Sequence, residues 1–384
     1  MVTVYFFTNV APHYRAPLWD VLLNDSNWNT HFFYCDDHKS GVKMIDLNKA
    51  GFVTKQEHFH KLKCYRWKDR KQVWQKGVVS QCIKGGFDYA IFLGEISRLS
   101  TWIAAIVCRL RGVHVTFWGH GLYGNESRLR LILKKTLFRL AHAHLLYERR
   151  AKELLIKQGF NPSKLYVIFN SLDYDTHKSL CHKLELLDKK GVFYFFKNPA
   201  MPVIIFIGRL TPVKKLELLL EAVNRINQDS PKLNLVIIGD GPERKKLEKM
   251  GTSGLENKWL YFTGACYDEN EIGKYLLKSD LCVSPGNVGL TAVHSLSFGT
   301  PVCTHDNMSN QMPEAEIIKD GYNGFLFKEN NIDDLKNKLE HWFTGERDES
   351  VVRKRAYEMI DRYYNPNYQL TVINRLVNGQ KPEL

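Results

Sequence analysis

Hydrophobic residues along this chain gather in short runs rich in β-branched and aromatic side chains, and these runs alternate with amphipathic helical patterns. The alternation predicts parallel sheets whose strands are joined by crossover helices. The expected strands are residues 2–7, 31–35, 89–94, 114–118, 144–147 and 165–169, then 203–208, 233–239, 260–262, 280–285, 300–305 and 324–327. The expected helices are residues 16–23, 100–111, 128–140, 150–158, 215–226, 242–250, 269–277 and 290–298. We therefore predict an α/β protein with two Rossmann-like domains facing each other across a cleft.

The same pattern divides the chain, whose 384 residues are more than one core usually holds. Between residues 173 and 202 the alternation gives way to a polar, charged stretch that ends near two prolines. We predict an N-terminal Rossmann-like domain at 1–175, a linker at 176–200, a C-terminal Rossmann-like domain at 201–360 and a final helix at 361–384 that packs back on the N-terminal domain.

Composition and charge limit the classes of partner and the cellular compartment that we expect. The 54 Lys and Arg exceed the 41 Asp and Glu, and the net charge of +13 favours phosphorylated ligands, an anionic membrane or nucleic acid. Since no nucleic-acid recognition motif accompanies the charge, we expect no nucleic-acid partner. The 8 cysteines show no metal-ligand spacing, so we expect reduced thiols in a cytoplasmic protein. No signal peptide or apolar run of about 18 residues is evident, and any membrane contact would be peripheral.

Two cations follow the first strand of the second predicted domain. That strand ends in Gly208 and is followed at once by Arg209, and Lys214 precedes a Leu-rich helix. Cations beside a helix N-terminus form an anion site, because their charge adds to that of the unpaired amides and the helix dipole. Arg209 and Lys214 could therefore neutralise a diphosphate without a metal, although both could also be ordinary surface cations.

The stretch SPGNVGLTAVHSLSFGTP, residues 284–301, supplies a second predicted anion site. Gly286 and Gly289 allow close backbone approach, and the amides of Gly289, Leu290 and Thr291 lie at the start of a short helix. An ordinary strand–turn–helix connection would explain the same pattern.

The order of motifs in the second half narrows these alternatives. It runs GRL-Lys, GDGP (239–242), TGACYDEN (263–270), KSDLCVSPG (278–286), GL (289–290), GTPV (299–302) and DGYNGFLF (320–327). This series resembles the retaining, metal-independent glycosyltransferases of family 4, which have the GT-B fold and use nucleotide sugars. The first half resembles that family more weakly, in residues 8–19, 116–121 and 167–173.

The resemblance implies roles for individual residues. Arg209 and Lys214 would hold the donor diphosphate and stabilise the leaving group, with no metal or other cofactor. The base would lie against Ala265, Cys266 and Tyr267, and the phosphates against the amides of residues 289–291. His120 matches the histidine near the transferred sugar, though it could instead be a structural residue of its Trp-Gly-His-Gly turn.

The chain departs from the family's pattern at two positions. Where the family has two glutamates separated by seven residues, this chain has Gly286 and His294. We hypothesise that a ring nitrogen of His294 bonds the nucleotide ribose, the alternative being a helix residue without a ligand. Asn287 and the later segment 305–316 are candidates to replace the first glutamate, with no basis in the sequence for choosing between them.

Other candidates follow strands of the first predicted domain. His13, Tyr14 and Arg15 come after the first strand and Glu95 after the third, on the edge expected to face the acceptor. A helix-entry loop and a solvated acid would explain these residues equally. The helix Arg128–Leu140 is basic on one side and apolar on the other, which suits either an anionic membrane surface or a buried helix with a solvated basic face.

The sequence as a whole favours a glycosyltransferase that moves a sugar from a nucleotide-diphosphate sugar to a glycan or lipid-linked glycan, in polysaccharide or surface-glycan biosynthesis. The expected location is the cytoplasm, at the inner face of the membrane. The resemblance implies retention: in the family's proposed mechanism a leaving phosphate oxygen takes the acceptor proton and no side-chain base is required, which fits the absence of an obvious carboxylate pair. Inversion would need His120 or Glu95 as base. Two alternatives remain: a sugar-nucleotide epimerase or hydrolase of the same fold, and a non-catalytic nucleotide-sugar-binding protein.

Overall fold

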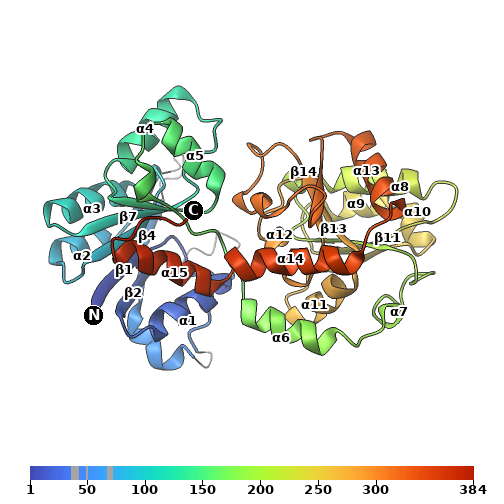
Figure 1. The fold of residues 1–384 in the computed structure, drawn as a ribbon, viewed down its shortest axis with the longest axis horizontal. Helices are drawn as coiled ribbons and strands as arrows, with labels where there is room; N and C mark the ends of the chain where they lie inside the picture. Colours follow the sequence, from blue (N-terminus) through green and yellow to red (C-terminus); the bar gives the residue numbers. More distant parts are fainter. Residues whose placement is uncertain (36–42, 49–50, 67–71) are drawn as a thin grey trace. The chain divides into compact units, whose positions relative to one another are not determined.

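The structure is a computed structural model that describes residues 1–35, 43–48, 51–66 and 72–384 (Figure 1). It divides into two units, each with a parallel sheet: unit 1 comprises residues 1–173 and 365–384, and unit 2 comprises residues 174–364. Both have the α/β, Rossmann-like architecture that the hydrophobic pattern predicts. The cleft between them stays a prediction.

Unit 1 is built on a seven-stranded parallel sheet in the order β3-β2-β1-β6-β7-β8-β9. The strands are β1 (Val2–Phe7), β2 (Trp28–Cys35), β3 (Phe59–Leu62), β6 (Tyr89–Leu93), β7 (His114–Gly119), β8 (Ala143–Leu146) and β9 (Leu165–Val167). One face packs on α1 (Ala16–Asn24) and α15 (Pro366–Val377). The other face packs on α2 (Val78–Lys84), α3 (Leu99–Leu110), α4 (Arg128–Phe138) and α5 (Arg149–Lys157).

Unit 2 has a six-stranded parallel sheet in the order β12-β11-β10-β13-β14-β15. Its strands are β10 (Val203–Ile207), β11 (Asn234–Ile238), β12 (Leu260–Gly264), β13 (Leu281–Ser284), β14 (Val302–His305) and β15 (Gly324–Phe327). Its helices are α6 (Tyr174–Leu184), α7 (Lys189–Val192), α8 (Leu216–Ile226), α9 (Arg244–Met250), α10 (Thr252–Glu256), α11 (Glu269–Lys278), α12 (Leu290–Ser297), α13 (Ile332–Thr344) and α14 (Glu349–Tyr363). The apolar residues of α8 and α13 share one core with the sheet.

Both sheets reverse strand order beside their first strand, between β1 and β6 in unit 1 and between β10 and β13 in unit 2. Loops at the carboxyl ends of strands diverge at such a switch point, and this is where ligands bind in folds of this kind. The fold therefore places the segments after β10 and β13 side by side in unit 2, and those after β1 and β6 in unit 1.

The predicted linker at 176–200 differs from the structure, which forms α6 and α7 there and places both in unit 2. The polar sequence reflects helices exposed on one side, with Leu184, Phe193 and Phe196 buried. The chain returns to unit 1 after residue 364, so the final helix α15 belongs to that unit. The predicted boundary at 360/361 falls inside α14 instead.

The expectation that every cysteine is reduced is wrong for one pair. Cys35 and Cys64 form a disulfide with their Cα atoms 5.9 Å apart. Cys35 ends β2 and Cys64 begins β4 (Cys64–Arg66), which pairs antiparallel with β5 (Val73–Gln75). The pairing of β2 with β3 places Cys35 beside Leu62, two residues before Cys64, and so brings the two sulfurs together. Among the described residues, no helix is both long and apolar enough to cross a membrane.

Candidate functional site

The switch point of unit 2 brings the two predicted anion-binding segments into direct contact. An ideal Cβ built on Gly286 would lie 2.0 Å from the carbonyl oxygen of Val213 and 2.7 Å from the Cα of Lys214. The Gly286 amide donates to the Lys214 carbonyl over 3.0 Å. The backbone of residues 213–214 therefore requires glycine at position 286. Any side chain with a Cβ would clash in this conformation.

Lys214 is fixed in place by Asn287. Its Nζ donates to the Asn287 backbone oxygen at 2.7 Å and to Oδ1 at 3.0 Å. An ammonium has three N–H donors. Two of them have acceptors among the described residues, so the third is available for a ligand oxygen. Burial lowers the pKa of Lys214, an effect that the charge of the buried Glu314 opposes. The arrangement holds a partly desolvated cation ready for an anion.

Arg209 and the start of α12 lie beside this candidate anion site. Arg209 is exposed directly after β10. Gly289, with φ 55°, precedes α12, whose first residues are Leu290 and Thr291. The Thr291 hydroxyl donates to the carbonyl oxygen of Ile207, at the end of β10, over 3.0 Å. This bond joins the helix start to the strand that carries Arg209, so positive groups and amides share one edge of the sheet.

Gln311, which lies in the candidate segment 305–316, braces the same turn, a role that the sequence reasoning did not assign to it. Its Oε1 accepts from the Val288 amide at 2.9 Å, and its Nε2 donates to Thr304 Oγ1 at 2.8 Å. Thr304 Oγ1 donates in turn to the Ser284 carbonyl at 2.8 Å. A glutamine before a 3₁₀ turn gives no sign of this role in the sequence.

The predicted base-binding residues follow β12. Ala265 and Tyr267 are exposed and Cys266 is half-buried. The next residue, Asp268, begins α11 by accepting from the Asn270 amide at 2.8 Å. The segment is thus available at the same edge of the sheet, and its role in binding a base stays a prediction.

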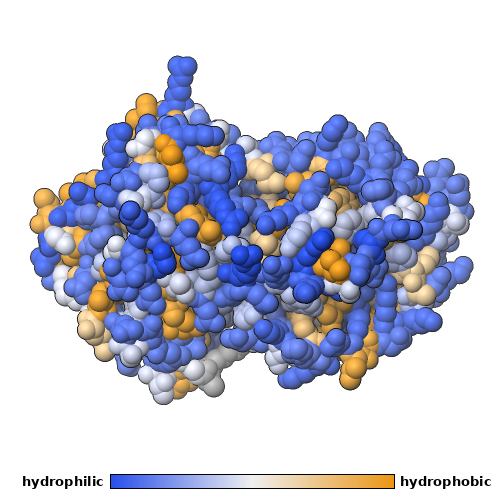
Figure 2. All heavy atoms as spheres, in the orientation of Figure 1, coloured by the Kyte–Doolittle hydropathy of each residue, from blue (hydrophilic) through white to orange (hydrophobic). Residues whose placement is uncertain are grey.

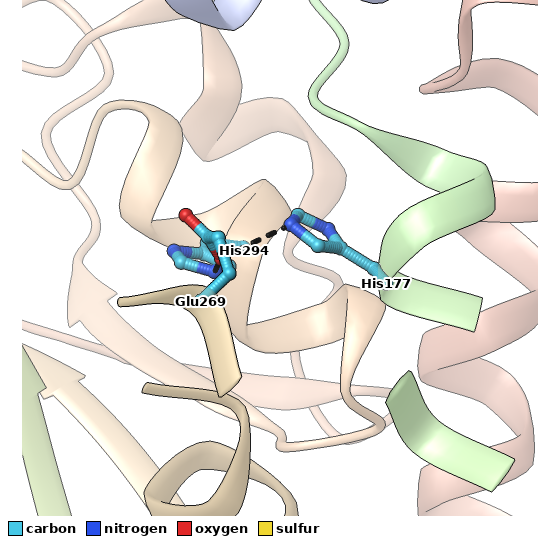
Figure 3. A group of neighbouring side chains, drawn as sticks. All are labelled: His177, Glu269 and His294. Atoms are coloured by element: carbon cyan, nitrogen blue, oxygen red, sulfur yellow. Dashed lines mark hydrogen bonds and ion pairs between the residues drawn. The ribbon is translucent and has the colours of Figure 1, made fainter. Parts of the chain in front are cut away.

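His294 has a partner that the sequence did not reveal. Its Nε2 lies 3.0 Å from Glu269 Oε2, and Nε2 of His177 lies 3.3 Å from the same oxygen (Figure 3). The two imidazole rings stack with centroids 4.9 Å apart. Burial would raise the pKa of Glu269, but bonds from His177 and His294 outweigh it and hold that pKa far below its usual range. The ring nitrogen we expected to reach a ribose therefore faces a carboxylate.

Unit 1 has its own cluster at the carboxyl ends of β1, β7 and β8, centred on Arg15. The Arg15 guanidinium lies 4.6 Å from the ring centroid of Trp118 and donates to the Tyr147 hydroxyl. Tyr147 also contacts the ring of His120, with centroids 5.0 Å apart. Arg15 and His120, two predicted site residues, are thus brought together by an aromatic pair that the sequence reasoning did not name.

His120 is neutral in this environment. Burial lowers its pKa to about 4, against the opposing charge of Glu95 and with the help of Lys134 and Arg15. Its Nδ1 is buried and has no hydrogen-bond partner among the described residues. An imidazole with an unused nitrogen can accept or donate one hydrogen bond to a bound molecule.

The other acceptor-side candidates already have protein partners. Glu95 Oε2 accepts from Arg98 Nε at 2.9 Å, and Arg98 is buried. His13 Nδ1 lies 3.1 Å from the carbonyl oxygen of Lys43, and Tyr14 contacts the His13 ring edge to face. Glu95 thus forms an ion pair with a buried arginine. This pairing makes Glu95 a less suitable candidate for a catalytic base.

Helix α4 divides its cations between two environments. Lys134 is buried, with Nζ 2.9 Å from Glu126 Oε1 and 2.8 Å from the Gly121 carbonyl. It therefore does not belong to a solvated basic face. Leu129 and Ile132 are 69% and 60% exposed, and they lie among the exposed cations of the helix. Figure 2 shows orange apolar atoms among blue ones over α4 and α5.

One cavity of unit 2 has none of the predicted donor residues in its lining. It has a volume of about 740 Å³ and lies between α6, α14 and the end of α11 in unit 2. Its lining includes His177, Cys181, Arg353 and Tyr357.

Part of the chain matches a known protein family. Residues 193–359 match the family described as glycosyl transferases group 1. A sulfoquinovosyl transferase of Arabidopsis thaliana is 28% identical over 171 residues, which cover 43% of this chain and 31% of that protein. A UDP-Gal:alpha-D-GlcNAc-diphosphoundecaprenol alpha-1,3-galactosyltransferase of Escherichia coli is 25% identical over 261 residues, 64% of this chain and 62% of that protein. The chain thus spans less than two thirds of the length of these curated relatives.

A solved structure resembles almost the whole chain. HepE of Anabaena in complex with UDP has a TM-score of 0.68 at 16% identity and covers 98% of this chain and 100% of its own. The likeness shows the fold, which is the two-domain GT-B fold.

Proposed function

We propose that this chain, whose residues 193–359 match the group 1 glycosyl transferases, transfers a sugar from a nucleotide-diphosphate sugar to a glycan or lipid-linked glycan. The observation that carries the proposal is the contact of the two anion-binding segments at the switch point of unit 2. Lys214, held by Asn287, lies there against the turn that leads into α12. Comparison with the relatives supports a role in surface-glycan biosynthesis.

The proposed reaction depends on stabilising the departing nucleoside diphosphate. Arg209 and Lys214 supply two positive charges, and the first amides of α12 supply hydrogen-bond donors for the phosphate oxygens. These groups do what a divalent metal would do at a diphosphate, so we propose that none is needed there. We propose that the sugar keeps its anomeric configuration. A phosphate oxygen of the leaving group can take the proton of the acceptor, which attacks the sugar from the face that the diphosphate leaves.

Acceptor binding is proposed for unit 1. The free Nδ1 of His120 and the guanidinium of Arg15 lie at the carboxyl edge of its sheet. Hydroxyl groups of a sugar are suitable partners for both. If the reaction inverted, His120 would be a better base than Glu95, which is paired with Arg98.

The test is nucleotide release from UDP-, GDP-, dTDP- and CMP-sugars, measured with and without glycan and lipid-linked acceptors. Arg209→Ala and Lys214→Ala are expected to lower kcat/KM for the accepted donor at least about 100-fold, the loss seen when one charge-stabilising donor is removed. Lys245→Ala removes an exposed cation of the same unit and should leave the rate unchanged. Turnover without acceptor would instead indicate an epimerase or hydrolase, and binding without turnover a non-catalytic protein.

We also propose a peripheral contact with an anionic membrane through α4, at the inner face of the cytoplasmic membrane. Exposed Leu129 and Ile132 would enter the headgroup region, with Arg128 and Arg130 beside them. Flotation with vesicles containing anionic lipid should recover the protein, and Leu129→Glu with Ile132→Glu should abolish recovery. Equal recovery of wild type and double variant would reject this contact.

A further inference from the structure

Three residues from different helices of unit 2 converge at one point. His177 lies in the first turn of α6, Glu269 is the first residue of α11, and His294 lies in α12. The segments are far apart in sequence, and the packing of α6 on both α11 and α12 brings them together. Among the described residues, this is the one group of His, Cys, Asp and Glu whose potential ligand atoms cluster closely enough to hold a metal ion.

The separations between these atoms suit a tetrahedral ion. Nε2 of His294 and Nε2 of His177 lie 3.0 and 3.3 Å from Glu269 Oε2, and the three ligand atoms all lie within 4.8 Å of one another. Zinc binds imidazole nitrogen and carboxylate oxygen at about 2.0–2.2 Å, which places tetrahedral ligands roughly 3.4 Å apart. Both nitrogen–oxygen separations therefore lie within about 0.5 Å of the spacing that the ion requires.

The surroundings favour a site with one open side. His177 is 3% exposed, and the Phe298 ring lies 5.1 Å from the His177 ring and 5.7 Å from that of His294. The apolar neighbour limits the ways in which these imidazoles can turn. The Glu269 side chain is 45% exposed, so water or another small ligand can reach the remaining position.

From this geometry we propose that His177, Glu269 and His294 form a binding site for a divalent first-row transition metal ion, with zinc as the preferred ion. Two imidazoles and one carboxylate match the borderline ions of this class, whereas Mg²⁺ and Ca²⁺ prefer oxygen ligands throughout. The ion would join α6 to the starts of α11 and α12. This proposal does not depend on the proposed transfer reaction. His294 lies within α12, whereas the Lys214–Asn287 contact precedes that helix.

The test uses the full chain, freed of metal by dialysis against a chelator and kept without nucleotides. Titration with Co²⁺, followed by its visible absorption bands, and with Zn²⁺, followed by calorimetry, should show one ion per chain and a rise in Tm. Glu269→Gln and His294→Gln should each weaken binding by at least about 100-fold. Removing a residue that only hydrogen-bonds to a metal ligand weakens binding by up to about 100-fold, and removing a ligand itself should weaken it more. Mg²⁺ at millimolar concentration should not displace Co²⁺.

Two variants serve as matched controls. His182→Gln changes an exposed histidine of the same helix α6. His60→Gln removes a member of the histidine pair in unit 1, where His31 Nδ1 lies 3.0 Å from His60 Nε2. Both should bind the ion as wild type does, and circular dichroism establishes that all variants are folded. Since the Glu269 side chain is 45% exposed, Glu269→Ala replaces either ligand variant if that variant fails to fold.

The proposal is overturned by any of three results. These are no uptake of Co²⁺ or Zn²⁺ by the wild type at micromolar concentration, wild-type affinity in both folded ligand variants, or loss of the ion in His60→Gln.

Discussion

Replacing Gly286 by alanine should destabilise unit 2 through a single steric contact. The added Cβ would meet the Val213 carbonyl oxygen at 2.0 Å, where ordinary van der Waals contact begins at 3.4 Å, so the two segments must separate by more than 1 Å. The φ angle of Gly286 is not in the left-handed region, and the cost is therefore one of space rather than of backbone strain.

The magnitude follows from that overlap. Forcing one extra carbon into a packed site costs about 1–3 kcal/mol, and separating the segments also weakens the 3.0 Å bond from the Gly286 amide to the Lys214 carbonyl. For a domain of this size, each kcal/mol lowers Tm by about 2–4 °C. We expect Gly286→Ala to lower Tm by about 2–12 °C, and Gly286→Glu, which restores the acid of the family's pattern, by more.

Differential scanning calorimetry measures the change, and Gly191→Ala is the matched control. Gly191 also has a φ outside the left-handed region, and its added Cβ would come no closer than 3.9 Å to another group, Asp188 Oδ2. This control should unfold at or slightly above the wild-type temperature, because alanine favours the helix. A Gly286→Ala protein that unfolds within 1 °C of wild type would refute the steric argument.

Three further predictions concern charged and titrating groups. NMR titration of labelled histidine should show His120 changing charge near pH 4, because burial lowers its pKa; a midpoint near 6.5 would contradict its burial. Lys134→Met should destabilise unit 1 by about 3–5 kcal/mol in urea unfolding, because it leaves Glu126 buried without its cation, while Arg139→Met changes an exposed charge and should have little effect. Bonds from Lys215, Asn307 and Asn310 lower the pKa of Glu329 to about 2, so Glu329→Gln should cost stability at pH 7 and progressively less as pH falls from 4.5 to 2, where the wild-type carboxylate gains its proton. A stability difference that does not vary over that range would exclude this ion pair as the source.

Much of the fold and part of the site could be predicted because they depend on local pattern. Alternating apolar runs place β10 and β13, and Gly208 and Gly289 mark where each of those strands gives way to a helix. Since parallel strands end at one edge of a sheet, those patterns also place Arg209, Lys214 and the start of α12 near one another.

The sequence by itself determined the type and order of these elements, because hydrophobic periodicity and turn residues act over a few neighbours. Only the tertiary structure decided why residue 286 must be glycine, since the carbonyl oxygen that excludes a Cβ belongs to Val213. It alone paired Cys35 with Cys64 and gave His294 the partners His177 and Glu269. Such contacts join residues far apart in the chain, and their energies depend on close packing and burial, which no single segment specifies.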